Sequence, residues 1–90
     1  MTSFSSLMAG QKLLPIIQAD TVEQGLNIAR AMSLAGIKLV EVVLRTSASI
    51  DVLKAIKQEF PELIVGAGTV ITPTILDKAV EAQADFIVTP

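Results

Sequence analysis

Leu39-Val-Glu-Val-Val-Leu-Arg45 is the most informative segment for the fold, because it is an almost continuous apolar run that carries two charged residues on one side. Successive side chains of a strand point to opposite faces, so Glu41 and Arg45 share one face. The other face is wholly apolar and consists of Val40, Val42 and Leu44. Such a run is typical of a parallel strand that is covered on both faces. We expect the apolar face to pack on helices and the Glu41 face to point to the concave side.

Three further short apolar runs repeat this signal. The four runs are Leu13–Ile17, Leu39–Leu44, Leu63–Val65 and Phe86–Val88. Their starts lie 26, 24 and 23 residues apart, which is the size of a βα unit. The spacing therefore predicts four parallel strands joined by helices.

Helical patterns fill the intervals, and each opens on a residue that caps free amide groups. The expected caps are Asp20 or Thr21, Ser47 or Ser49, and Thr72, the last followed by Pro73 at the first helical position. The first helix is expected to end at Gly36 in a left-handed cap and the second to stop before Pro61. A short helix over Ser3–Met8 is expected before the first strand.

This order of elements predicts a single α/β segment over residues 1–90, made of parallel βα repeats. A (β/α)8 barrel and a doubly wound sheet both fit such repeats. A complete barrel needs at least about 200 residues, so four strands in 90 residues correspond to half of a TIM barrel. Because the chain stops at Pro90, directly after the fourth strand, we expect it to be a truncation.

Composition excludes several classes of function. The chain has no Cys and no His, which excludes thiolate or imidazole metal sites and a Ser-His-Asp triad. A net charge of -2 and the absence of Trp and Tyr argue against nucleic acid as a partner. No signal peptide and no run of 18 apolar residues is present, so we expect a cytoplasmic protein without a membrane span. The 51% hydrophobic content is more than a small domain hides alone, so we expect either a partner, such as a second copy in a homo-oligomer, or missing sequence to cover the rest.

Glu41 is the strongest candidate for chemistry, because a charge in a doubly buried strand is costly unless it is paired or hydrogen-bonded. A structural ion pair with Arg45 is the alternative, but four residues of extended strand span roughly 13 Å. Barrel active sites lie at the carboxyl ends of the strands, where Arg45 falls. We therefore interpret Glu41 and Arg45 as functional residues.

The passage Val65-Gly-Ala-Gly-Thr-Val70 is expected to be a βα turn in which Gly66 and Gly68 permit unusual backbone angles. It lacks the third glycine of a dinucleotide-binding motif and the Gly-Lys pair of a phosphate-binding loop. The Thr69 hydroxyl lies near a carboxyl strand end and is a candidate to bind a ligand carboxylate. Lys12 and Lys38 fall at the amino ends of their strands, and we expect Lys54, Lys57 and Lys78 to be solvated helix residues. None of these lysines is a convincing Schiff-base residue.

The motifs EVVLRT (Glu41–Thr46) and VGAGTV (Val65–Val70) together resemble the 2-keto-3-deoxy-6-phosphogluconate (KDPG) and 4-hydroxy-2-oxoglutarate (KHG) aldolase family. The passages LPII, AGIKLVEV, EFPELIVGAGTV and DFIVTP also fit the N-terminal half of that family. The resemblance implies a class I aldolase in which a lysine forms a Schiff base with pyruvate, without a cofactor or metal.

By this resemblance Glu41 is the catalytic proton-transfer residue. Arg45 and Thr69 bind the pyruvate carboxylate, and Pro90 lines the site. The family usually has Thr where this chain has Val43, which alters polarity inside the barrel. The family's lysine lies on the sixth strand and its phosphate site after the seventh and eighth, so this chain carries half of the site and is expected to be inactive alone.

Two other interpretations stay open. The chain is alternatively a non-catalytic half-barrel that associates with itself through its open edges and through apolar residues exposed on the concave face, such as Leu39, Val43 and Ile64 or Val65. A phosphate-binding barrel of another family is a third interpretation, which leaves Glu41 and Arg45 on one face unexplained.

Overall fold

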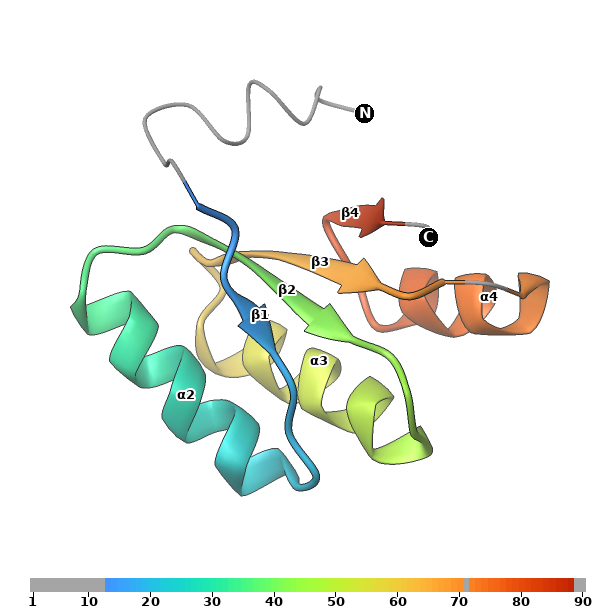
Figure 1. Ribbon diagram of the computed structural model, residues 1–90, viewed down its shortest axis with the longest axis horizontal. Helices are drawn as coiled ribbons and strands as arrows, with labels where there is room; N and C mark the ends of the chain where they lie inside the picture. The colour runs from blue at the N-terminus through green and yellow to red at the C-terminus, as the bar shows by residue number, and fades with distance from the viewer. Residues whose placement is uncertain (1–12, 71, 89–90) are drawn as a thin grey trace.

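The computed structural model describes residues 13–70 and 72–88, and within them a four-stranded parallel sheet has the order β1-β2-β3-β4. The strands are β1 (Ile16–Ile17), β2 (Leu39–Val43), β3 (Ile64–Gly68) and β4 (Phe86–Val88). The helices are α2 (Val22–Leu34), α3 (Ser47–Glu59) and α4 (Pro73–Glu81). The parallel βα repeats predicted from the sequence are confirmed (Figure 1). The helix expected over Ser3–Met8 lies outside the described residues.

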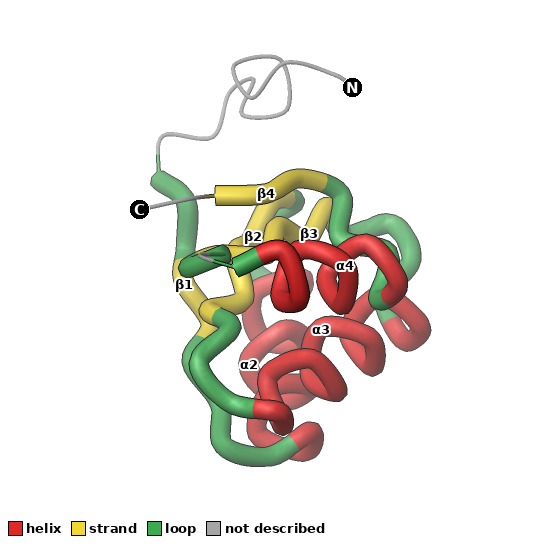
Figure 2. Tube along the Cα trace, turned by 90° about the vertical axis from the view of Figure 1, so that its right-hand side faces the viewer, coloured by secondary structure: helices red, strands yellow, loops and turns green. Residues whose placement is uncertain are grey.

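The three helices lie on one side of the sheet, as the tube in Figure 2 shows. The core between the two layers contains Ile17, Ala29, Val40, Val42, Leu44, Val52, Leu53, Ile56, Leu63, Val65, Ala67, Val70, Ala79 and Ala82. Because Val40, Val42 and Leu44 belong to this core, the expected helix-facing side of β2 is confirmed. We call the opposite side of the sheet, which carries Leu39, Glu41 and Val43, the inner face.

The helix ends follow the sequence signals closely. Gly36 has φ +86° after α2, and Ile37 N–H donates to the Met32 carbonyl at 3.0 Å, so the expected left-handed cap is confirmed. Thr21 and Thr72 cap α2 and α4. The cap of α3 is Thr46 rather than Ser47 or Ser49, because Ser49 occupies the third helical position and bonds back to Thr46 in a capping box.

The strand bounds differ most from the sequence prediction in β1 and β3, while β2 ends one residue early, at Val43. The first strand is limited to two residues, since Pro15 has no N–H to give, although its carbonyl accepts from Glu41 N–H at 3.0 Å. The third strand runs on through Gly66 and Gly68 to a total of five residues. These glycines were expected in a turn, and they pair instead with Glu41 and Val43 of β2.

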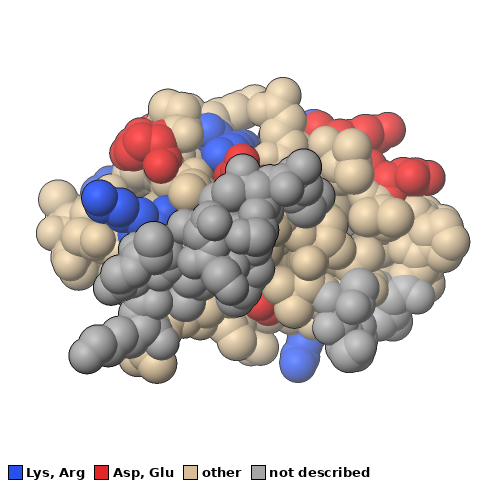
Figure 3. Space-filling view, turned by 90° about the horizontal axis from the view of Figure 1, so that it is seen from above, with Lys and Arg blue, Asp and Glu red and all other residues tan. Residues whose placement is uncertain are grey.

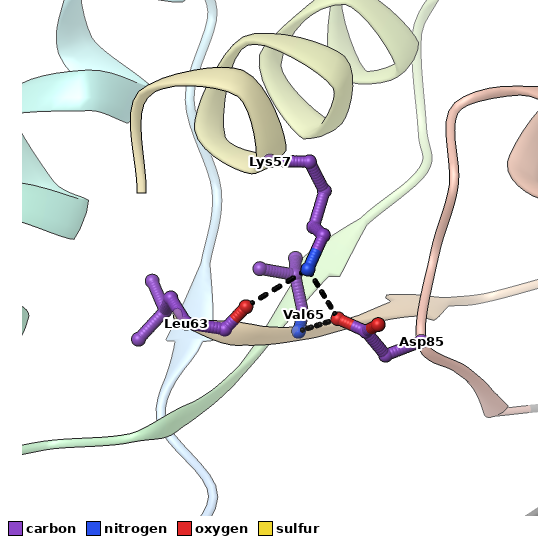
Figure 4. A network of polar contacts seen from close by, with 4 residues as sticks. All are labelled: Lys57, Leu63, Val65 and Asp85. Carbon is purple, nitrogen blue, oxygen red and sulfur yellow. Dashed lines mark hydrogen bonds and ion pairs between the residues drawn. The ribbon is translucent and has the colours of Figure 1, made fainter. Parts of the chain in front are cut away.

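One polar network fixes the amino ends of β3 and β4 beneath α3 (Figure 4). The Lys57 ammonium donates to Asp85 Oδ2 at 2.7 Å and to the Leu63 carbonyl at 3.0 Å. The same Asp85 oxygen accepts from Val65 N–H at 2.8 Å. Lys57 was expected to be a solvated helix residue, which is wrong: its side chain is only 13% exposed because it reaches across the strand ends.

We expect Asp85→Ala to lower the free energy of unfolding by about 1–2 kcal/mol, since it strips the Val65 amide and the Lys57 ammonium of an acceptor at a partly exposed site. Urea unfolding of the 90-residue chain measures this. Asp77→Ala on exposed α4 is the matched control and is expected to change stability by less than about 0.5 kcal/mol. Equal effects of the two substitutions would contradict the structural role of the network.

Candidate active site

One row of residues crosses the inner face through all four strands. Ile16 of β1 pairs with Glu41 of β2, Glu41 with Gly66 of β3, and Gly66 with Phe86 of β4. The next row toward the carboxyl ends joins Val43, Gly68 and Val88. The parallel register thus brings the predicted acid and the predicted glycine motif together on the inner face.

Glu41 is buried in this row, with a residue exposure of 8%. Its side chain runs forward over Gly68, since a Cβ built on that glycine would lie 2.6 Å from the Glu41 carboxyl carbon. Within residues 13–70 and 72–88 its carboxylate has no hydrogen bond or ion pair, and burial raises the pKa of Glu41 above its ordinary value. The expectation that Glu41 points away from the helices is confirmed, and a buried acid of this kind suits proton transfer.

We expect Glu41→Gln to raise the free energy of unfolding at neutral pH. The pKa of Glu41 is raised in the folded state, so below the ordinary glutamate value both states are protonated and burial costs nothing extra. As pH rises through the folded-state pKa, the buried carboxylate ionises and wild-type stability is lost. Urea unfolding at acidic and neutral pH therefore gives a Gln-minus-wild-type difference that grows with pH, and a pH-independent difference would contradict it.

Arg45 lies beyond the end of β2, in the exposed loop that leads into α3. It lines a hollow of about 220 Å³ together with Leu44, Thr46, Ser47, Ile50, Ile75 and Lys78, on the helix side of the strand end. Because the strand alternation stops at Val43, it does not fix the direction of the Arg45 side chain. Among the described residues no hydrogen bond or ion pair joins Arg45 to Glu41. The role of Arg45 in binding a substrate carboxylate stays a prediction.

Thr69 follows β3 directly, at the carboxyl edge of the sheet, with φ +61°. The left-handed region is a rare conformation for a β-branched residue and marks local backbone strain. Unusual backbone angles were expected at Gly66 and Gly68, which is wrong: neither glycine has a positive φ, and Thr69 turns the chain instead. No sequence signal indicated this. The ligand role of Thr69 stays a prediction, and the expected site residue Pro90 lies outside the described residues.

None of the four described strands contains a lysine. Lys54 and Lys57 belong to α3, Lys78 to α4, and Lys38 precedes β2 at its amino end. The described part of the chain also contains no cluster of acidic residues suited to hold a metal ion, and no helix in it is long and apolar enough to cross a membrane. The chemistry of the inner face therefore centres on Glu41.

The parallel strands and the single helix layer make half of an α/β barrel whose inner face holds a buried acid. A family model for KDPG and KHG aldolases matches residues 4–90. The chain belongs to this aldolase family.

Named relatives support the assignment. The chain is 38% identical over 89 residues to the KHG/KDPG aldolase of Escherichia coli K12. The aligned region covers 99% of this chain and 42% of the relative. A crystal structure of the KDPG aldolase of Legionella pneumophila, with pyruvate captured as a covalent carbinolamine, superposes with a TM-score of 0.90 at 36% identity. The crystal structure of the KDPG aldolase of Zymomonas mobilis ATCC 29191 superposes with a TM-score of 0.89 at 34% sequence identity. Both solved structures cover 99% of this chain, which spans 43% of each of them.

Proposed function

We propose that the chain supplies the proton-transfer part of a class I aldolase site that cleaves KDPG or 4-hydroxy-2-oxoglutarate to pyruvate and an aldehyde. The observation that carries the proposal is Glu41, which is buried on the inner face of a family member and whose carboxylate has no hydrogen bond or ion pair among the residues that the structure describes. The lysine that forms the Schiff base would come from the part of the barrel that follows in the relatives.

Glu41 has a definite role in this scheme. The lysine amine condenses with the substrate ketone, water leaves, and the iminium becomes an electron sink. The Glu41 carboxylate then takes the proton of the C4 hydroxyl, the C3–C4 bond breaks, and its electron pair forms an enamine as the aldehyde departs. Glu41 returns the proton to C3, and hydrolysis of the iminium releases pyruvate and frees the lysine. A raised pKa suits a group that both accepts and donates a proton near neutral pH.

The carboxyl edge of the sheet supplies the groups that would hold the substrate. We assign the pyruvate carboxylate to Arg45 and Thr69, because a guanidinium and a hydroxyl at adjacent strand ends make a charge-assisted clamp. Pro90 would line the same edge after β4. Charged side chains of both signs are scattered over the face seen in Figure 3, which fits a small-molecule substrate better than a polyanion. We place the protein in the cytoplasm, with no nucleic acid or membrane partner.

A chimera tests the proposal. The matched 89-residue segment of the Escherichia coli relative is replaced by this chain, so that the rest of the barrel completes the site. We expect pyruvate release from both substrates, measured by coupling to a pyruvate-dependent reductase. A folded chimera that forms the pyruvate Schiff base and yet releases no pyruvate from either substrate would count against the roles proposed for Glu41, Arg45 and Thr69 in this half of the site.

A self-associating half-barrel is the second candidate, and it is favoured by the open sheet edges. In the described part of the chain, β1 and β4 each have a strand on one side only, and Ile16 on β1 is 56% exposed. Such edges are templates for pairing with another chain. A two-fold dimer that joins the β4 edge of one copy to the β1 edge of the other would give eight parallel strands. Sedimentation at high micromolar concentration is expected to show a dimer, and a compact monomer there would exclude it.

The expected exposure of apolar side chains on the concave face is wrong. Leu39 and Val43 were expected to be exposed to solvent there, whereas they are 0% and 7% exposed. Their alternation is as predicted, but both side chains are buried on the inner face. The edges, rather than a bare inner face, are therefore the surfaces available for pairing.

A further inference from the structure

The third strand presents an almost bare surface on the inner face. Val65 and Ala67 belong to the helix-side core, so the residues of β3 that face inward are Ile64, Gly66 and Gly68. Two successive inward positions therefore have no side chain. We call this surface over Gly66 and Gly68 the bare strip.

Two large side chains from the neighbouring strands fill the bare strip. The Phe86 ring of β4 lies over Gly66, where a built Cβ would overlap the ring and lie 2.6 Å from its Cδ2 atom. The Glu41 carboxylate of β2 lies over Gly68 in the same way. Real Cβ atoms do not approach other atoms so closely, which means that each glycine is needed for the side chain above it.

The register explains why the carboxylate lies where it does. Glu41, Gly66 and Phe86 share one row across the sheet, so the space directly beside Glu41 is the space over Gly66. The Phe86 ring already occupies that space. The nearest bare surface is over Gly68, one row closer to the carboxyl ends of the strands, where barrel chemistry takes place.

We propose that Phe86 and Gly68 are positioning residues for the Glu41 carboxylate: the ring closes the row over Gly66, and Gly68 receives the carboxylate one row further toward the carboxyl edge. This assignment rests on the proposed proton-transfer role of Glu41 for its functional meaning. Under this assignment the VGAGTV motif has two roles: Gly68 positions the Glu41 carboxylate, and the same motif contains Thr69.

The surroundings of the carboxylate are apolar in this arrangement. On the inner face the described strands beside it contribute Ile16 from β1, the bare strip from β3, and Phe86 and Val88 from β4. None of these side chains titrates or carries charge, and Arg45 lies beyond the end of β2. The position over Gly68 therefore keeps Glu41 desolvated, in agreement with its raised pKa.

Carbon-detected NMR titration of the 90-residue chain tests the proposal without substrate. The side-chain carboxyl signal of Glu41, assigned by its loss in Glu41→Gln, reports the pKa, and nuclear Overhauser contacts report the position. In the wild type we expect contacts from the Glu41 γ protons to the α protons of Gly68. Gly68→Ala is expected to push the carboxylate into solvent and lower the pKa of Glu41 toward its ordinary value. Phe86→Leu is expected to shift the contacts toward Gly66.

Gly25→Ala is the matched control, because its added methyl group would overlap Val52 in the helix layer, away from Glu41. It is expected to lower stability while leaving the Glu41 pKa and contacts unchanged. Absence of the Gly68 contact in the wild type would overturn the proposal even if a variant failed to fold. Unchanged Glu41 contacts in Phe86→Leu, or an unchanged pKa in folded Gly68→Ala, would also overturn it. An inactive chimera with these NMR results intact would instead count against the proposed function.

Discussion

The purified 90-residue chain is expected to release no pyruvate from KDPG or 4-hydroxy-2-oxoglutarate above the uncatalysed rate. The iminium step needs an amine inside the site, and no lysine comes from β1 to β4. Loss of the nucleophile removes the covalent path altogether, so the remaining buried acid has no electron sink to work with. A coupled assay at high protein concentration measures the rate.

Borohydride reduction in the presence of pyruvate supplies the control. Intact mass is expected to show no adduct on the 90-residue chain and one adduct on the chimera. A stoichiometric adduct on the short chain, together with pyruvate release, would mean that one of its own lysines reaches the inner face.

Glu41→Gln in the chimera is expected to lower kcat by roughly 10²- to 10⁴-fold with little change in KM, because general acid–base groups contribute on that scale only in the transition state. Glutamine keeps the size of the side chain and loses the ability to accept the proton. Glu59→Gln, at the exposed end of α3, is the matched control and is expected to leave kcat unchanged. A Glu41→Gln chimera as active as this control would remove Glu41 from the mechanism.

The strand face of Glu41 could be predicted because a period of two on an apolar strand leaves no other solution. The capping threonine and following proline of α4, and the glycine that ends α2, were equally readable, since each satisfies free backbone groups by local bonds. These features depend on residues close together in the sequence.

The inner face could not be predicted in the same way, because it depends on pairing across strands. Gly66 and Gly68 are typical of a turn, and only the register with Glu41 and Phe86 makes them part of a strand. The positive φ of Thr69 and the reach of Lys57 to Asp85 also come from tertiary structure. The side-chain direction of Arg45 could not be predicted from the alternation along the strand, because β2 ends at Val43, two residues before Arg45.

Deuterium uptake into the methyl group of pyruvate isolates the proton transfer that we assign to Glu41. Proton NMR of the chimera in D₂O follows this exchange, which needs the enamine and a group that moves the proton, but no bond cleavage. We expect rapid exchange in the Glu41 chimera and a rate lower by roughly 10²- to 10⁴-fold in Glu41→Gln, with Glu59→Gln unchanged. Equal exchange rates in the two chimeras that differ only at residue 41 would contradict it.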